Sequence, residues 1–283
     1  MSLNKTVLIR TLNKSIIAKT GDILPRNNWR DSTNFANFEF CIQEAFNELG
    51  IKSFLLPESP KSNHNYSDFD YFVEIHKNKT VSSSSNFFYM QMHLSGLFTF
   101  DNKGWGADHS DYNSIIKKIQ SYDYDSSLKF YEEIQDWYLS NKMTKHKKEN
   151  EISQDNNKLP DKFILIPLQV PRDYVLLKHA NISVLEFIEV VSNWAIKNNE
   201  VIVFKIHPYS GGDKEIKNLV DKYVSTNINI FLSNDNIVTL LINSLGIITI
   251  NSGVGFESLI VDKPVILLGN ADYDCVSKKI DYD

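Results

Sequence analysis

Between residues 161 and 269, short apolar runs alternate with amphipathic segments, and this alternation restricts the fold more than any other feature of the chain. The apolar runs have the length of buried strands and lie at 163–168, 201–206, 228–232, 247–250 and 265–268. The segments between them predict helices at 183–196, 214–223, 237–244 and directly after Gly253. Strands and helices in this alternation form a parallel sheet with both faces covered. The sequence therefore predicts an α/β domain.

The first half of the chain is less regular. Apolar runs at 6–9, 52–56, 70–75 and 86–92 predict strands, and apolar spacing predicts helices at 38–49 and within 111–140. Residues 142–160 are polar and densely charged, which indicates an interdomain linker or a disordered loop, with a solvated helix end as the alternative. We expect an N-terminal α/β domain over 1–141, a linker over 142–160 and a C-terminal Rossmann-like domain over 161–283.

Composition limits the partners of the protein. The 283 residues are 42% hydrophobic with a formal net charge of −5, which argues against a nucleic-acid-binding surface. No apolar run approaches the roughly 20 residues of a membrane span. Cys41 and Cys275 lie far apart without metal-ligand spacing, so a reducing cytoplasm is the expected location.

Polar residues follow the strands predicted at 163–168, 201–206 and 247–250. In a parallel sheet, ligands gather at the carboxyl ends of the strands. Each of these motifs alone has an ordinary structural explanation as a turn or a helix cap, but their occurrence at three such strand ends predicts one shared site. The residues concerned are Gln169, Arg172, Asp173, Lys205, His207, Asn251, Ser252, Gly253 and Glu257.

The residue types at these strand ends suit the transfer of a sugar from a nucleotide. Backbone N–H groups at the start of a helix and the Ser252 hydroxyl can hold a phosphate, although Asn251-Ser252-Gly253 can equally be only a helix cap. His207 can donate to a phosphate oxygen, and Lys205 adds charge unless strand alternation points it away. Asp173 can act as a nucleophile or a base, and Glu257 suits hydrogen bonds to sugar or ribose hydroxyls.

Several segments resemble the capsule polysaccharide biosynthesis proteins, a family that includes bacterial retaining β-Kdo transferases. The resemblance is carried by QVPRD (169–173), KIHP (205–208), NSGVGFESL (251–259) and KPVILLGNADY (263–273), and more weakly by GLFTFDNKGWGADHS (96–110). It implies a GT-B fold, in which two Rossmann-like domains with parallel sheets face a cleft.

The resemblance also implies a function and residue roles. The expected protein is a retaining glycosyltransferase of capsule or surface polysaccharide synthesis, with CMP-Kdo as the donor and no cofactor or metal. Asp173 matches the proposed nucleophile, His207 and Ser252 match donor-phosphate contacts, and Glu257 matches the motif glutamate. Gly104, Trp105 and Gly106 fall in the acceptor-side segment. The implied acceptor is a saccharide or glycolipid, and peripheral association with the inner membrane or a capsule assembly complex is a further expectation.

One departure from the family concerns the general acid/base. The Kdo transferases carry an acidic residue just before the glycine- and aromatic-rich segment, whereas residues 91–96 read QMHLSG. His93 is one substitute, and Asp101 or Asp108 from the following loop is another. Two other functions therefore remain open: a catalytically idle nucleotide- or sugar-binding partner of a capsule assembly complex, and a GT-B-like nucleotide-sugar epimerase.

Overall fold

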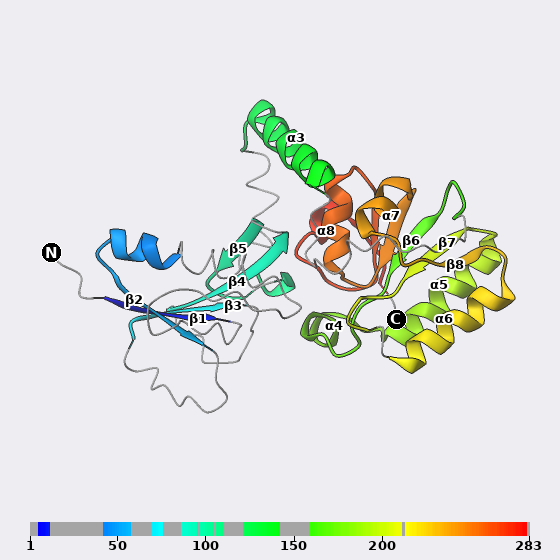
Figure 1. Cartoon of the computed structure of the whole chain (residues 1–283), viewed down its shortest axis with the longest axis horizontal. Helices are drawn as coiled ribbons and strands as arrows, with labels where there is room; N and C mark the ends of the chain where they lie inside the picture. The colour runs from blue at the N-terminus through cyan, green and yellow to red at the C-terminus, as the bar shows by residue number, and fades with distance from the viewer. Residues whose placement is uncertain are drawn as a thin grey trace. The chain divides into compact units, whose positions relative to one another are not determined.

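The computed structural model describes residues 5–11, 42–57, 69–75, 86–94, 97–104, 106–109, 121–141, 159–210 and 213–281. The chain divides into two compact units (Figure 1). Unit 1 comprises Met1–Asn113 with Lys145–Lys147, and unit 2 comprises Ser114–Thr144 with Lys148–Asp283. Each unit contains its own sheet.

The described strands of unit 1 form a five-stranded sheet in the order β2-β1-β3-β4-β5. Strands β1 to β4 are parallel, and β5 pairs antiparallel with β4. Val7, Ile9 and Val73 are buried in it and pack against Ile42 and Phe46 from a helix at 42–48. The strands are β1 (Thr6–Thr11), β2 (Lys52–Pro57), β3 (Tyr71–Ile75), β4 (Phe87–Leu94) and β5 (Leu97–Asp101).

The described strands of unit 2 form a six-stranded, entirely parallel sheet in the order β11-β10-β9-β6-β7-β8. This arrangement confirms the α/β class predicted from the sequence. The strands are β6 (Ile164–Pro167), β7 (Ile202–Lys205), β8 (Ile230–Leu232), β9 (Gly246–Thr249), β10 (Val265–Leu267) and β11 (Lys278–Lys279).

The helices of unit 2 cover both faces of this sheet. Crossovers between parallel strands of one sheet are almost always right-handed, so the helices lie on one face while the chain moves from β6 to β8 and on the other face after it returns to β9. Helices α5 and α6 accordingly lie side by side, away from α7 and α8 (Figure 1). The helices are α3 (Tyr124–Asn141), α4 (Tyr174–His179), α5 (Val184–Asn198), α6 (Lys214–Thr226), α7 (Ile237–Asn243) and α8 (Gly253–Ile260).

Helix α3 belongs to unit 2, although the expected domain boundary placed residues up to 141 in the N-terminal domain. The physical reason is its packing on α8, in which the Tyr138 side chain is fully buried. Helical periodicity shows which face of α3 is apolar, but not which neighbour that face contacts. Of the linker predicted at 142–160, only residues 159 and 160 lie within the described ranges.

No helix in the described ranges is long and apolar enough to cross a membrane.

Candidate functional site

The predicted site residues of unit 2 lie at the switch point of its sheet. The chain leaves β6 towards β7 and β8, and it then returns to β9 on the other side of β6. In open α/β sheets, ligands bind outside the carboxyl ends of the strands at such a reversal. The carboxyl ends of β6, β7 and β9 carry the three predicted motifs, so the topology brings these motifs to one edge.

Gln169 and Asn251 connect the ends of β6 and β9. The two side chains are buried, and Gln169 Nε2 donates to Asn251 Oδ1 at 2.9 Å while Asn251 N donates to Gln169 Oε1 at 3.1 Å. Asn251 Nδ2 also donates to the Val175 carbonyl of α4 at 3.2 Å. The structure therefore gives both amides a role in holding the edge together, and donor contact by either side chain stays a prediction.

Ser252 is the N-cap of α8. Its hydroxyl oxygen accepts a hydrogen bond from Val254 N at 3.3 Å, as the capping interpretation predicted, and its own O–H remains a donor group. A methyl group added at Gly253 would meet no described atom within 4 Å. The first turn of α8 is therefore capped and also open beside Gly253, so capping and phosphate binding are compatible.

Tyr273 fixes the start of α8 from the side. Its hydroxyl donates to the Ser252 carbonyl, and its ring fills the space beside Gly255. Burial raises the pKa of Tyr273 well above its usual value, and the charges of Asp272, Asp274 and Glu257 raise it further. The phenol consequently stays protonated and keeps donating to the backbone.

His207 and Lys205 lie at the end of β7. His207 Nδ1 accepts a hydrogen bond from Tyr209 N at 3.1 Å. The neutral imidazole therefore carries its hydrogen on Nε2, which makes Nε2 a donor. Lys205 is the last residue of β7 and is 8% exposed, so its charge is held largely inside unit 2.

Asp173 and Arg172 are exposed in the turn after β6. Asp173 is the N-cap of α4 and accepts a hydrogen bond from Val175 N at 3.1 Å. The sequence did not predict this short helix or its cap. The carboxylate thus has a structural role, and its exposure is compatible with the predicted chemical role.

Glu257 is a buried carboxylate in α8, 4% exposed. Tyr138 of α3 donates its hydroxyl hydrogen to Glu257 Oε2 at 2.6 Å. Sequence reasoning missed Tyr138, because its helical spacing with Tyr131 and Ile134 indicated only an apolar face. A tyrosine on the buried face of a helix needs a partner for its hydroxyl, and this was the available signal.

A cavity of about 370 Å³ opens beside α4 and the first turns of α5 and α6. Its wall is mainly apolar, with Pro171, Leu176, Leu177 and Ile182 among the lining residues. Asp213 and Glu215 also line it, so the cavity is unfavourable for a phosphate.

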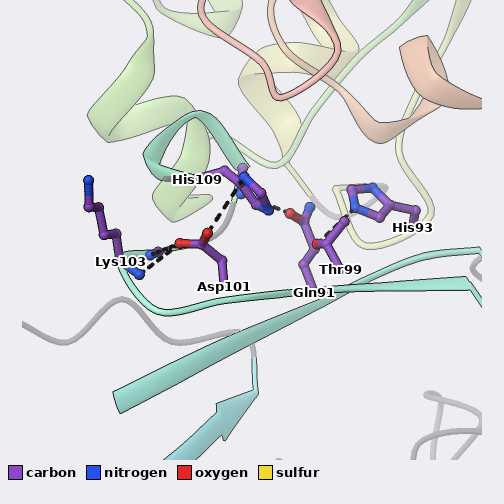
Figure 2. Close-up of polar contacts among 8 residues, drawn as sticks. Gln91, His93, Thr99, Asp101, Lys103 and His109 are labelled. Atoms are coloured by element: carbon purple, nitrogen blue, oxygen red, sulfur yellow. Dashed lines mark hydrogen bonds and ion pairs between the residues drawn. The ribbon is translucent and has the colours of Figure 1, made fainter. Parts of the chain in front are cut away.

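The predicted catalytic residues of unit 1 lie on β4 and β5 (Figure 2). His93 is 8% exposed and its Nε2 lies 3.1 Å from Thr99 Oγ1, so this imidazole is packed into the β4–β5 pair. Asp101 is 7% exposed, and its Oδ1 accepts from the backbone N–H groups of Lys103 at 2.7 Å and Gly104 at 3.0 Å. Asp101 therefore anchors the loop that follows β5.

The same loop carries the predicted acceptor-side residues. Gly104 lies against Asp108, where a larger side chain has little room, and Gly106 has a left-handed backbone with φ of 64°. Gly106 N donates to Gln91 Oε1 at 2.9 Å, which ties the loop to β4. Both glycines are thus required by the loop's shape. Trp105 lies outside the described residues.

His109 is a further candidate, which sequence reasoning did not include. Its Nδ1 lies 3.7 Å from Asp101 Oδ2, and its side chain is 17% exposed (Figure 2). A carboxylate that faces one imidazole nitrogen orients the ring, as in catalytic carboxylate–histidine pairs. Asp101 and His109 lie on either side of Gly104 and Gly106 in the sequence, and a carboxylate and an imidazole so close to one loop were the available signal for this pair.

In the part of the chain that the structure describes, no group of three or more His, Cys, Asp or Glu side chains is arranged to hold a metal ion.

An all-parallel sheet with polar groups at its switch point is the architecture of a Rossmann-like domain. The profile of a family described as capsule polysaccharide biosynthesis protein matches residues 108–277, which is more than half of the chain. The chain therefore belongs to the capsule polysaccharide biosynthesis protein family.

Comparison with individual proteins supports the fold. A 116-residue segment is 34% identical to protein FixF of Sinorhizobium fredii; it covers 40% of this chain but only 27% of FixF. Among solved structures, the Thermosulfurimonas dismutans KpsC β-Kdo 2,7 transferase superposes with a TM-score of 0.60 at 14% identity, covering 98% of this chain and 84% of that chain. The KpsC β-Kdo 2,4 transferase gives 0.54 at 13% identity, covering 96% and 84%. The fold is GT-B-like, as predicted.

Proposed function

We propose that the protein is a glycosyltransferase of capsule or surface polysaccharide synthesis that uses a nucleotide-activated sugar, with CMP-Kdo as the first candidate donor. The proposal rests on the edge of the unit 2 sheet outside the carboxyl ends of β6, β7 and β9, which we call the switch edge. The fold brings the N-terminus of α8, the helix that contains Glu257, and His207 to this edge. Membership of the capsule family and the likeness to the KpsC fold support it.

The donor is proposed to bind at this edge. The first N–H groups of α8 and the Ser252 O–H face a phosphate, and the helix dipole favours its negative charge. His207 Nε2–H donates to a phosphate oxygen, and Lys205 adds positive potential. Glu257 accepts hydrogen bonds from sugar or ribose hydroxyls. Gln169, Arg172 and Asn251 complete the proposed donor-binding set.

The proposed chemistry is a double displacement with retention of configuration. The Asp173 carboxylate attacks the anomeric carbon, and the bond from that carbon to the phosphate oxygen breaks with its electron pair leaving on the nucleotide. The acceptor hydroxyl then attacks the same carbon, loses its proton to a base and releases Asp173.

For proton transfer, His109 is better suited than His93. His93 Nε2 is engaged with Thr99 inside the sheet, whereas His109 is more exposed and faces Asp101. Asp101 is therefore proposed to orient His109, rather than to transfer the proton itself. The loop of Gly104, Trp105 and Gly106 is proposed to contact a saccharide or glycolipid acceptor.

The proposal requires no metal or cofactor beyond the nucleotide-sugar substrate. The proposed enzyme acts in the cytoplasm, with peripheral association at the inner membrane or with a capsule assembly complex.

The idle binding partner remains the second candidate function, because residues 91–96 lack the family's carboxylate and Asp173 is already a helix cap. The two candidates differ in one respect, which is whether the bound donor is consumed.

The substitution Asp173→Asn separates the two candidates. Asn caps helices as well as Asp, so the variant should keep α4 intact. We expect loss of CMP release from CMP-Kdo in the presence of a capsular saccharide acceptor, while CMP still raises the melting temperature. Asp213→Asn is the matched control, because Asp213 caps α6 in the same way and should keep full activity. Full activity of Asp173→Asn would remove Asp173 from the nucleophile role, and a wild-type protein that binds CMP-Kdo without consuming it would favour the binding partner.

A further inference from the structure

Helix α3 holds the C-terminal end of α8. Tyr131 Oη lies 3.2 Å from the Leu259 carbonyl and 3.0 Å from the Ile260 carbonyl, and Gln135 Nε2 donates to the Ile260 carbonyl at 2.7 Å. Carbonyl groups in the last turn of a helix have no partner within that helix. Side chains of α3 therefore supply donors that α8 itself lacks, and the two helices lie next to each other (Figure 1).

A second attachment lies farther along α3 and is of a different kind. Tyr138 is fully buried, and its hydroxyl donates to the Glu257 carboxylate at 2.6 Å, a length typical of a strong phenol–carboxylate bond. The two residues are 119 positions apart, so only the tertiary fold brings them together. Tyr138 thus contacts Glu257, a predicted site residue. Tyr131 instead contacts backbone carbonyls of α8 and the exposed side chain of Asp262, which follows α8.

The geometry of α8 directs Glu257 towards the switch edge. Side chains on an α-helix incline towards its N-terminus, and the N-terminus of α8 begins at Gly253, one turn before Glu257. The bond from Tyr138 reaches one of the two carboxylate oxygens, Oε2, and restrains the orientation of the Glu257 side chain. A glutamate held in one rotamer before binding loses less side-chain entropy when a ligand arrives.

We infer that Tyr138 is a positioning residue that pre-organises Glu257 to accept hydrogen bonds from the ribose hydroxyls of the bound nucleotide. The inference rests on the proposed nucleotide-binding function and adds to it a specificity: ribonucleotides are preferred over deoxyribonucleotides through a residue that does not touch the ligand. It also gives α3, which was expected to belong to the other domain, a function in unit 2.

The test compares CMP with 2′-deoxy-CMP and 3′-deoxy-CMP by calorimetric titration of the full-length protein. We expect the wild type to bind CMP more tightly than the deoxy nucleotides. Tyr138→Phe keeps the ring but removes the donor, and we expect it to weaken CMP binding about fivefold while leaving deoxy-nucleotide binding nearly unchanged. If Tyr138→Phe loses the preference for CMP over the deoxy nucleotides, Tyr138 positions Glu257. If its affinity for all of these nucleotides falls equally, the substitution has only destabilised the protein.

Tyr131→Phe is the matched control, because it removes a hydroxyl from the same helix that bonds α8 but not Glu257. It should lower stability and leave the ratio of CMP to deoxy-CMP affinity unchanged. In the Glu257→Gln background, which itself should discriminate poorly, Tyr138→Phe should have no further effect. If Tyr138→Phe fails to fold, Glu257→Gln alone carries the test, and full discrimination by that variant would overturn the inference.

The outcomes separate the two levels of the proposal. A wild type that discriminates, together with a Tyr138→Phe variant that discriminates equally well, overturns the positioning role and leaves the proposed function intact. A wild type that binds none of CMP, UDP and GDP overturns the proposed function, and the positioning role falls with it. A wild type that binds CMP without preference over its deoxy forms overturns ribose recognition alone.

Discussion

Tyr131, Tyr138 and Tyr273 each direct a phenol hydroxyl at α8 or its end. Tyr131 reaches the last carbonyls, Tyr138 reaches Glu257, and Tyr273 reaches the carbonyl of the Ser252 cap. A phenolate cannot donate a hydrogen bond, so this support depends on protonated tyrosines. Burial and the neighbouring Asp262 raise the pKa of Tyr131 to about 12, and burial raises that of Tyr273 well above its usual value.

These raised pKa values predict a loss of stability at alkaline pH. The unfolded state releases the phenol proton near pH 10, whereas folded Tyr131 retains it to about pH 12, so the free energy of unfolding falls between these values. Urea midpoints measured from pH 8 to pH 11.5 should decline, and Tyr131→Phe should make the decline shallower. An equally steep decline in the variant would contradict this assignment.

The positions of the candidate site residues in the fold were predictable wherever an apolar run in the chain marks the preceding strand. Ser252, His207 and Asp173 follow apolar runs that end abruptly, and the structure places each of them in the segment that follows a strand of one sheet. The amide pair Gln169–Asn251 and the contact of Tyr138 with Glu257 join residues 82 and 119 positions apart. No local pattern encodes such contacts, so the sequence indicated the types of group but not their partners.

At the scale of single elements, α8 depends on a close approach that only glycine permits. The Tyr273 ring lies where a Cβ at Gly255 would be placed. Strand β10 and the segment after it bring Tyr273 to this position, so the phenol and the helix are fitted to each other. Phe256 also contacts the Tyr273 ring edge-on, with centroids 6.5 Å apart.

The substitution Gly255→Ala tests this fit. Alanine at an ordinary interior helix position stabilises by up to about 1 kcal/mol relative to glycine. Here the added methyl group must displace Tyr273, and overpacking of this kind costs about 1–3 kcal/mol. We therefore expect a net loss of stability in urea unfolding together with weaker nucleotide binding. A more stable variant would show that Tyr273 does not pack as described.

Elements were predictable where periodicity is strong, as in the strands and helices from β6 to β10. Some described elements were missed, among them the two-residue strand β11. Helix α4 has only the six residues Tyr174–His179, too few for a helical period to be recognised. Strand β5 was included in the loop that follows residues 91–96, because its place in the sheet depends on antiparallel pairing with β4 rather than on its own pattern.

At the scale of the whole molecule, α3 changes where one unit ends and the other begins. The expected boundary followed the change in composition near residue 141, whereas packing assigns residues 114–144 to unit 2. Without α3, the last carbonyls of α8 would lose Tyr131 and Gln135, and the Glu257 carboxylate would lose Tyr138. A buried acceptor that loses its donor costs about 1–3 kcal/mol.

Two fragments test this assignment. Residues 114–283 contain α3 and should unfold cooperatively, because they retain both the sheet and the helix packed on α8. Residues 159–283 lack α3 and should unfold at a lower urea concentration with a broader transition. Equal stability of the two fragments by circular dichroism would show that α3 contributes nothing to unit 2.

The central claim is that the switch edge of unit 2 binds a nucleotide, and a thermal-shift screen with CMP, UDP and GDP tests it most directly. A nucleotide at one hundred times its dissociation constant stabilises the folded state by about 2.7 kcal/mol, which raises the melting temperature by several degrees. We predict such a rise with at least one of the three, CMP first, and a smaller rise in Ser252→Ala and His207→Ala. An unchanged melting temperature with all three nucleotides would contradict the claim.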